Sequence, residues 1–364
     1  MQRNFKAVAS ALIIALVVGA CGTSSSGDAA PTPAVIHESI EVEVTREIEV
    51  EVPVEPPVVY VYSGRHYGLM EQAFAAFQED TGIEVRFTFG KDAELRERLK
   101  AEGRFTPADV LFTVDAGNLW LAAEEGLLQP IQSETLEHNI PTHLQDLDNR
   151  WFALSLRTRT VMYNPERVSP EQLSTYEALA DPEWHGRLCL RPSTKVYTLS
   201  LVASLIAAHG VAGAEEIVQG WVANNPTYID SDTRILETVA AGGCDVAITN
   251  HYYLARLVDE NADFAVRVFW ANQDDRGVHV NVSGGGVTAH AHNVNNAIRL
   301  LEWLSGPGQN LFADGNFEYP ANPQVDPHPL IAGWGNFVAD SILVSEFGRL
   351  QADAVQLLDR TGYE

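Results

Sequence analysis

The sequence predicts an α/β fold built from two domains. Short apolar runs typical of strands alternate with amphipathic helical stretches along most of the chain after residue 57. This alternation is typical of βαβ units and largely parallel sheets. A chain of 364 residues is long enough for two α/β domains, each with its own core. The hydrophobic content of 46% is ordinary for a soluble protein.

The N-terminus predicts a targeting segment that is not part of the fold. Arg3 and Lys6 precede an apolar run at 7–20, which is too short to span a membrane comfortably. The run ends in the sequence VGAC, which is similar to a bacterial lipobox with Cys21 as the lipidated residue. We therefore expect a lipoprotein signal peptide at 1–21, with an uncleaved anchor or an ordinary secretory signal as alternatives. The protein would be tethered by lipid in the periplasm or on the outer face of the cytoplasmic membrane.

Residues 22–56 are expected to form an acidic, flexible spacer. A Ser/Gly stretch follows Cys21, and the segment 37–57 interleaves seven glutamates with Val and Ile and contains one arginine. Dense like charge extends a chain, and three prolines close this segment. The alternative is an additional edge strand, because period-two alternation also indicates a strand with one apolar face.

The charge balance excludes one class of partner. The chain has 49 acidic and 24 basic residues and a net charge of -25. Binding to nucleic acid through a basic surface is therefore not expected.

Aromatic or imidazole side chains follow three of the expected strands, each just before a helical stretch. The strands are expected at 58–63, 188–190 and 245–249, and the helical stretches at 70–80, 199–208 and 254–258. The side chains are His66 with Tyr67, Tyr197, and Tyr252 with Tyr253. In open α/β sheets, ligands bind at the carboxyl ends of strands, so these five residues are expected to converge on one cleft.

Four phenols and one imidazole suit a hard, highly charged cation. A free phenol has a pKa of about 10, so it binds metal at neutral pH only where its phenolate is stabilised. Helix N-termini and a trivalent ion both act in that direction. Thiolates would indicate zinc or copper(I), and a carboxylate cage would indicate calcium or magnesium. The donor set therefore favours Fe³⁺, although any single tyrosine here is more simply explained by packing.

Four motifs resemble the ferric-iron-binding proteins of bacterial ABC importers. They are YSGRHY at 62–67, PADVLFTVDAG at 107–117, TNHYYLARL at 249–257 and DGNFEYP at 314–320. The resemblance covers about residues 57–364, and it implies a two-lobed type II periplasmic-binding-protein fold with a hinge. It also implies an ABC transporter permease as the partner, and we expect the protein to act as a monomer.

The family has two ligand patterns, and this chain matches the pattern with a His-Tyr pair from one lobe and three tyrosines from the other. The resemblance thus implies His66, Tyr67, Tyr197, Tyr252 and Tyr253 as iron ligands. The other pattern uses a glutamate, but the segment 113–118 contains Asp115 instead, which we interpret as a turn or helix-cap residue. Five protein donors nearly fill the coordination sphere, so an additional anion is not expected.

The alternation of expected strands and helices also predicts the boundaries of the two lobes. Lobe 1 is expected to comprise 57–151 and 277–364, and lobe 2 is expected to comprise 152–276. The segment 152–163 would lead into lobe 2, and Gly284 to Gly286 would permit an unusual backbone path after the return. Helices at 293–304 and 345–359 would close the fold. Because each lobe alone offers few donors, iron is expected to drive closure about the hinge.

Three arginines and two cysteines have further expected roles. Arg65, Arg157 and Arg159 are candidates to hold an anion or orient the phenolates, and Arg65 could balance the negative charge of four phenolates around Fe³⁺. Hinge salt bridges are the alternative for Arg157 and Arg159. Export makes a disulfide between Cys189 and Cys244 plausible, with two buried free thiols as the alternative.

A catalytic function has little support in the sequence, so we do not expect an enzyme. The chain has no nucleophile elbow, Walker loop or HExxH helix. The alternatives on the same fold are a receptor for an anion or small organic molecule and, less favoured, a redox enzyme with tyrosine-ligated iron.

Overall fold

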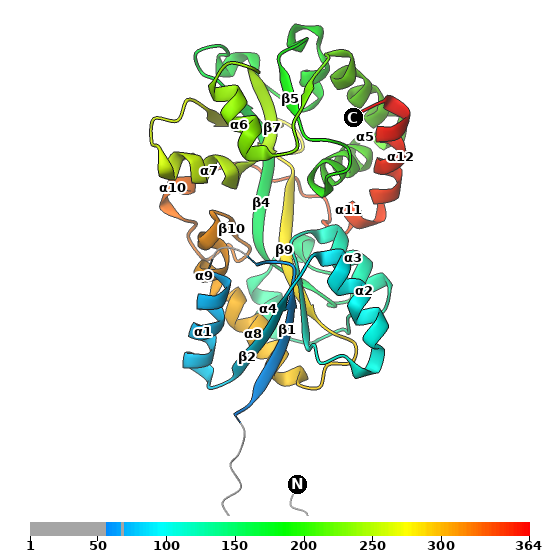
Figure 1. The fold of residues 1–364 in the computed structure, drawn as a ribbon, viewed down its shortest axis with the longest axis vertical. Coiled ribbons are helices and arrows are strands. Elements are labelled where there is room, and N and C mark those ends of the chain that lie inside the picture. The colour runs from blue at the N-terminus through cyan, green and yellow to red at the C-terminus, as the bar shows by residue number, and fades with distance from the viewer. Residues whose placement is uncertain (1–55, 67–68) are drawn as a thin grey trace, which may run out of the picture. The chain divides into compact units, whose positions relative to one another are not determined.

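The computed structural model describes residues 56–66 and 69–364 (Figure 1). The predicted signal peptide, the lipidation site Cys21 and the spacer up to residue 55 lie outside the described residues, as does Tyr67.

The described part of the chain has an α/β fold, as predicted. Its strands are β1 (Val58–Ser63), β2 (Glu84–Phe89), β3 (Val110–Thr113), β4 (Phe152–Tyr163), β5 (Leu188–Leu190), β6 (Thr227–Tyr228), β7 (Val246–Asn250), β8 (Arg267–Phe269), β9 (Val280–Val287) and β10 (Tyr319–Pro320). Its α-helices are α1 (Met70–Thr81), α2 (Asp92–Glu102), α3 (Ala116–Glu124), α4 (Glu134–Asn139), α5 (Val196–Ala223), α6 (Asp232–Ala240), α7 (His251–Glu260), α8 (Val294–Ser305), α9 (Gln309–Ala313), α10 (Pro329–Ala332), α11 (Glu346–Arg349) and α12 (Gln351–Thr361).

Strand β4 belongs to two groups of strands. The strand order is β2-β1-β3-β9-β4-β7-β5-β6, with β8 and β10 also paired to β4. Residues 152–158 of β4 pair with β9, whereas residues 159–163 pair with β7. We call β1, β2, β3, β9 and β10 with the first part of β4 the first sheet, and β5 to β8 with the second part of β4 the second sheet. Figure 1 shows β4 and β9 connecting the regions of these two sheets.

The strand directions correct one expectation. Strands β1, β2 and β3 are parallel to one another, and β5 is parallel to both β6 and β7. In contrast, β9 is antiparallel to β3 and β4, and β4 is antiparallel to β7. The prediction of largely parallel sheets is therefore wrong for the middle of the strand order, where β9 and β4 run antiparallel to their neighbours.

Helices cover both faces of the first sheet. Helices α1 and α8 pack together on one face, and α2 and α3 pack together on the other. Strands β3 and β9 between them are buried along their whole length, as expected for strands covered on both faces. Asp115 caps the N-terminus of α3, and its carboxylate accepts a hydrogen bond from the backbone N–H of Asn118 at 3.1 Å. The interpretation of Asp115 as a helix cap is thus confirmed.

The glycine run in β9 has a role different from the predicted one. The three glycines at 284–286 all pair with β3, and Gly284 and Gly285 also pair with β4, whose register shifts between Ala153 and Ser155. A Cβ atom on Gly284 would lie 2.2 Å from the carbonyl oxygen of Phe152, and one on Gly285 would lie 2.3 Å from the ring of Phe112. Glycine is required here because neighbouring strands and side chains approach too closely for any side chain.

Helix α5 is much longer than the predicted helical stretch at 199–208. By length and composition it could cross a membrane, and it is the one such helix among the described residues. Its side chains Val202, Leu205 and Val218 are nevertheless fully buried within the protein, as expected of a core helix. The helix changes direction at Gly210, whose φ of 70° lies in the left-handed region that favours glycine.

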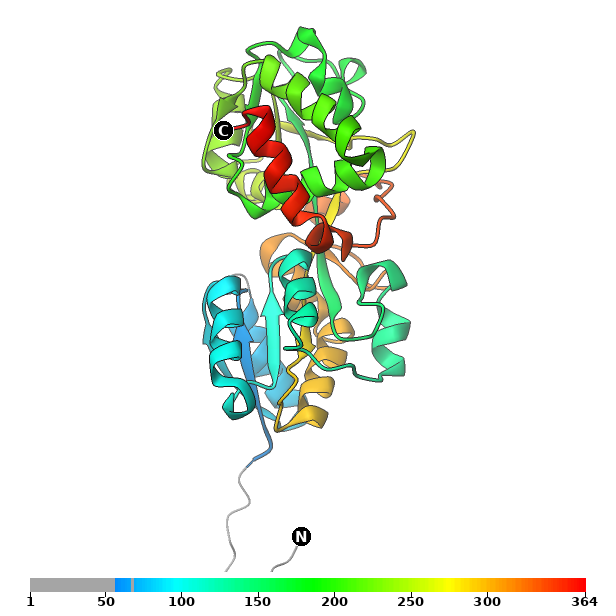
Figure 2. The same ribbon diagram turned by 90° about the vertical axis from the view of Figure 1, so that its right-hand side faces the viewer.

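The C-terminal helix packs beside α5. Figures 1 and 2 both show the red helix α12 along the green helix α5, and Arg360 forms a salt bridge with Glu215 at 2.9 Å. The predicted single helix at 345–359 is divided into α11 and α12. The lobe boundaries stay a prediction, and this packing favours placing the last helix with lobe 2 rather than lobe 1.

Candidate functional site

Three of the predicted ligands meet at the starts of two helices. Tyr197 is the second residue of α5, and Tyr252 and Tyr253 lie in the first turn of α7, which begins earlier than predicted. Strands β5 and β7 precede these helices and are parallel neighbours, so their carboxyl ends lie at the same edge of the second sheet. The hydroxyl of Tyr252 donates to the hydroxyl of Tyr197 at 3.3 Å, and the ring centroids of Tyr252 and Tyr253 are 4.4 Å apart. We call these three residues the tyrosine cluster.

Two arginines lie over the rings of the tyrosine cluster. The Arg157 guanidinium is 5.6 Å from the ring centre of Tyr197, and Arg256 is 5.3 Å and 5.4 Å from the rings of Tyr252 and Tyr253. A cation over an aromatic face is attracted by the ring and becomes more favourable still when the phenol ionises. Both guanidiniums therefore favour phenolates in the cluster, and Arg256 was not predicted from the sequence.

Burial opposes ionisation of the phenols in the absence of a metal. It raises the pKa of Tyr253 to about 12, with Tyr197 and Asp232 acting in the same direction and Arg191 acting against them. Tyr253 therefore keeps its proton at neutral pH unless a stronger positive charge displaces it. A trivalent cation supplies such a charge, because a bound metal ion dominates the local electrostatics.

The two residues before the tyrosine pair fix its orientation. The side-chain amide of Asn250 donates to the hydroxyl oxygen of Tyr252 at 3.1 Å. His251 is fully buried; its Nδ1 accepts from the backbone N–H of Thr158 at 3.1 Å, and its Nε2 donates to the carbonyl of Phe317 at 2.8 Å. Burial lowers the pKa of His251 to about 4, so the ring is neutral with both nitrogens engaged. His251 thus anchors α7 to β4 and does not act as a ligand.

His66 lies at the corresponding edge of the first sheet. It follows β1 and is exposed, and its Nδ1 lies 3.2 Å from the carbonyl oxygen of Gly64. Together with Asp92 and Val114, it lines a pocket at the carboxyl ends of β1, β2 and β3. The structure thus brings together Tyr197, Tyr252 and Tyr253 and places His66 on the other sheet.

The three arginines singled out in the sequence have different partners. Arg65 is buried and forms a salt bridge with Glu318 at 2.8 Å. Arg157 donates to the hydroxyl of Ser283 in β9 at 3.1 Å and to the carbonyl of Val114, which follows β3.

Arg159 is connected to the tyrosine cluster through Asn250. It forms a buried salt bridge with Asp232 at 2.9 Å and donates to the side-chain oxygen of Asn250 at 3.2 Å. Neither Asp232 nor Asn250 was singled out from the sequence. Asp232 stands far from the tyrosine motif along the chain, so no local pattern could identify it.

Cys189 and Cys244 form a disulfide in the structure. Cys189 lies in β5 and Cys244 stands just before β7, and their Cα atoms are 5.8 Å apart. The bond therefore fastens together the two strands whose ends carry the tyrosine cluster.

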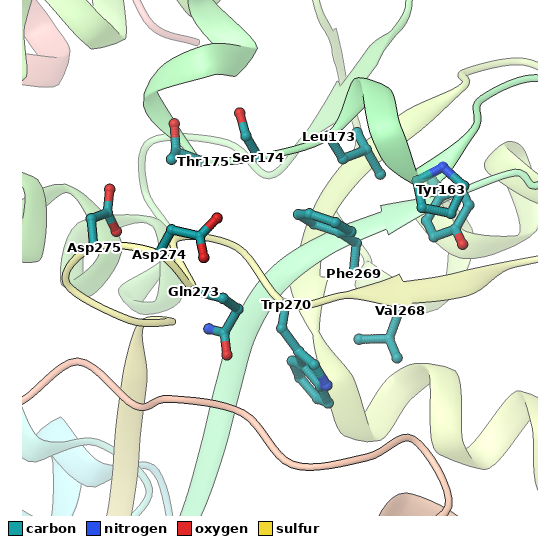
Figure 3. Close-up of a pocket in the computed structure, with 11 residues that line it drawn as sticks. Tyr163, Leu173, Ser174, Thr175, Val268, Phe269, Trp270, Gln273, Asp274 and Asp275 are labelled. Atoms are coloured by element: carbon teal, nitrogen blue, oxygen red, sulfur yellow. The ribbon is translucent and has the colours of Figure 1, made fainter.

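Other possible sites are less suited to a metal. Within residues 56–66 and 69–364, no group of three or more His, Cys, Asp or Glu side chains is arranged to hold a metal ion. A separate pocket of about 440 Å³ is lined by aromatic side chains, including Phe269 and Trp270, with Asp274 and Asp275 at one end (Figure 3). No member of the tyrosine cluster lines this pocket. Among the described residues, the tyrosine cluster is therefore the best candidate for a metal centre.

Comparison with known proteins gives relatives by sequence and relatives among solved structures. The chain is 41% identical over 323 residues to iron uptake protein A1 of Synechocystis sp. strain PCC 6803, covering 86% of this chain and 89% of the relative. It is similar to the solved Trichodesmium protein IdiA (FutA) in complex with iron and citrate, with a TM-score of 0.82 and 43% identity over 84% of this chain and all of the other. The Campylobacter jejuni ferric binding protein aligns with a TM-score of 0.77 and 33% identity over the same shares.

These matches confirm the predicted type II periplasmic-binding-protein fold. Residues 72–339 match the family model described as bacterial extracellular solute-binding protein. Members of such a family bind, outside the cytoplasm, solutes that are to be transported. The chain belongs to the bacterial extracellular solute-binding proteins, and its relatives include iron uptake and ferric-iron-binding proteins.

Proposed function

We propose that this chain captures Fe³⁺ outside the cytoplasm and delivers it to the permease of an ABC transporter. The observation that carries the proposal is the tyrosine cluster, in which phenols from the first turns of two helices meet with 3.3 Å between the Tyr197 and Tyr252 oxygens. Phenolates are hard, anionic oxygen donors that match a small trivalent cation. Relatives named for iron uptake and ferric binding add independent support.

His66 and Tyr67 would complete the ligand set from the other sheet. The imidazole would contribute a neutral lone pair, and Tyr67 a fourth phenolate. Four phenolates around one ferric ion carry a net charge of about one negative unit, so the loaded site needs positive charge nearby. Iron is the cargo in this scheme, and the protein performs no reaction on it.

The chain's own groups would prepare the phenols for the ion. Because the Asn250 amide donates to the Tyr252 oxygen at 3.1 Å, that oxygen is held in one orientation with a lone pair available. The helix N-termini at α5 and α7 and the guanidiniums of Arg157 and Arg256 favour the phenolate form. Each phenol that binds iron releases a proton to solvent.

Iron would close the protein about its hinge. Two donors, His66 and Tyr67, belong to the predicted lobe 1 (57–151 and 277–364), and the three tyrosines belong to lobe 2 (152–276), so neither lobe holds the full set. Strands β4 and β9 join the two sheets and would flex as the lobes approach. The closed form gains because it alone lets all donors bind the same ion. Small-angle scattering is expected to detect compaction on iron loading, and an unchanged radius of gyration would contradict this part of the proposal.

The remaining features fit an anchored receptor. Lipidation at Cys21 would hold a monomer at the membrane surface, where it meets the permease. The disulfide between Cys189 and Cys244 suits an exported protein and keeps β5 and β7 in register beneath the tyrosine cluster.

A ferric citrate titration followed by absorption tests the proposal. Wild-type protein is expected to develop a visible tyrosinate-to-iron charge-transfer band and to keep about one ion per chain through dialysis. Tyr252→Phe and Tyr253→Phe are expected to lose most of the band. Tyr228→Phe is a matched control, because Tyr228 packs against Tyr363 at 4.9 Å and is not part of the tyrosine cluster. A colourless protein that retains no iron would leave the fold unchanged and assign the chain to another solute.

A further inference from the structure

A buried group of three charged residues lies behind the tyrosine cluster. One carboxylate oxygen of Asp232 accepts from Arg159 at 2.9 Å, and the other accepts from Arg191 at 2.6 Å. The side chains are 0%, 4% and 10% exposed for Asp232, Arg159 and Arg191. We call these residues the Arg-Asp-Arg triad.

The triad is connected to the tyrosine cluster by an unbroken chain of hydrogen bonds. The Arg159 guanidinium that holds Asp232 also donates to the side-chain oxygen of Asn250 at 3.2 Å. Asn250 in turn donates to the Tyr252 oxygen at 3.1 Å, and Tyr252 donates to Tyr197 at 3.3 Å. Arg159, Asp232 and Arg191 are therefore linked through Asn250 to the hydroxyls of Tyr252 and Tyr197.

The triad carries one unit of uncompensated positive charge. It contains two guanidiniums and one carboxylate. Asp230 also lies 3.5 Å from Arg191, but it is 63% exposed and is itself paired with Lys195 at 2.6 Å. These two outer residues cancel each other and leave the excess charge of the triad unchanged.

One of the other buried arginines considered from the sequence has its own counterion. Arg65 is 1% exposed and lies 2.8 Å from Glu318, which is 0% exposed, so its charge is already matched. Arg157 and Arg256 lie over the rings but do not belong to the triad. The charge balance suggested for Arg65 therefore has a better candidate in the triad.

Stability alone gives a poor reason for the triad. Removing charged groups from water is costly, and a buried ion pair is at best weakly stabilising relative to apolar residues. A second guanidinium on the same carboxylate adds cost without adding a second counterion. Such an arrangement is favourable where an additional negative charge arrives, and the loaded iron site would bring one.

We propose that the Arg-Asp-Arg triad is the counter-charge of the loaded site: Asp232 holds two guanidiniums behind the tyrosine cluster, and their excess charge stabilises the negative charge created by the phenolates and Fe³⁺. This inference rests on the proposed function. In it, Asp232, Arg159 and Arg191 act through their charge and through Asn250, and none of them touches the ion.

The charge role makes predictions of opposite sign for two neighbouring substitutions. Arg191→Gln removes the excess positive charge and leaves the buried Arg159–Asp232 pair intact. It is expected to weaken iron binding by roughly tenfold, because that is the effect of one unit charge across about 10 Å at an effective dielectric constant near 20. Asp232→Asn removes the negative charge and is expected to bind iron at least as tightly as wild type. The double variant restores the original net charge and is expected to return to within about threefold of wild type.

The experiment is a citrate competition titration of the full chain, with the visible band as the readout. Arg191→Lys keeps the charge and is expected to stay within about threefold of wild type. Arg187→Gln is the matched control, because Arg187 stands at the opposite end of β5 and pairs with Asp245 at 2.6 Å. It makes the same change in net charge and is expected to leave iron affinity unchanged.

The outcomes separate the two proposals. If Asp232→Asn and Arg191→Gln both weaken binding and the double variant is the weakest, the triad is only a scaffold and the inference is overturned. Wild-type affinity in Arg191→Gln would overturn it as well. If Asp232→Asn does not fold, the comparison of Arg191→Gln with Arg191→Lys decides. A wild-type protein that binds no iron would instead refute the proposed function.

Discussion

The buried salt bridge between Arg65 and Glu318 gives a sharp prediction about stability. The two charged atoms are 2.8 Å apart, and the side chains are 1% and 0% exposed. Burial raises the pKa of Glu318, but Arg65 and Arg157 outweigh that effect and hold the pKa below its usual range. The carboxylate is therefore charged at neutral pH, and Glu318→Gln removes a charge on which a buried guanidinium depends.

The expected loss follows from the contacts of Glu318. One carboxylate oxygen accepts from Arg65 and from the hydroxyl of Ser155, and the other accepts from the Asn316 amide at 2.6 Å. A glutamine must turn its own NH₂ group towards one of these donors, so at least one hydrogen bond is lost as well as the ionic attraction. Breaking a buried pair on one side costs about 3–5 kcal/mol, and we expect about 3 kcal/mol here.

Urea unfolding at pH 7 measures this loss. The control is Glu346→Gln, because Glu346 pairs with Arg349 on the surface at 28% and 56% exposure and is expected to contribute less than about 0.5 kcal/mol. A loss below about 1 kcal/mol for Glu318→Gln would refute the reasoning, because it would mean that Arg65 is not held by this carboxylate.

Three further predictions concern the site and its support. Iron affinity is expected to fall as the pH falls, by up to about tenfold per pH unit for each phenol that must release its proton. Competition titrations at pH 6, 7 and 8 measure this dependence, and an affinity that does not change with pH would exclude phenolate ligands. Cys189→Ser with Cys244→Ser, which opens a 55-residue loop, is expected to cost about 4 kcal/mol in urea unfolding, and a loss under about 1 kcal/mol would contradict this. Burial lowers the pKa of His251 to about 4 in the folded protein, compared with about 6.5 in the unfolded chain. The free energy of unfolding is therefore expected to be unaffected by this group above about pH 6.5 and to decrease by about 3 kcal/mol as the pH falls towards 4. A His251→Gln variant is expected to lack this part of the pH dependence, and identical slopes would count against it.

The order of strands and helices around the site was predictable, because it follows from local sequence patterns. The apolar run of β1 and the strand before the tyrosine pair have the expected lengths, and Tyr197, Tyr252 and Tyr253 follow strands as predicted. The helix starts were less accurate: α7 begins at His251 because its buried ring hydrogen bonds to β4, a contact that no local pattern contains.

The rest depends on contacts between distant parts of the chain. The antiparallel pairing of β4 with β9 joins residues more than a hundred positions apart, and α12 returns to α5 from the end of the sequence. Asp232 stands at the start of an ordinary amphipathic helix, and only its position between Arg159 and Arg191 reveals a relation to the site. Composition and spacing carry no information about such pairings.

Resonance Raman spectroscopy of the iron-loaded protein, excited within its visible band, tests the central claim most directly. We expect enhanced tyrosinate ring modes in the wild type that weaken in Tyr252→Phe and persist in the matched Tyr228→Phe control. Iron bound without enhanced phenolate modes would contradict the account, because the ion would then be held by other groups than the tyrosine cluster.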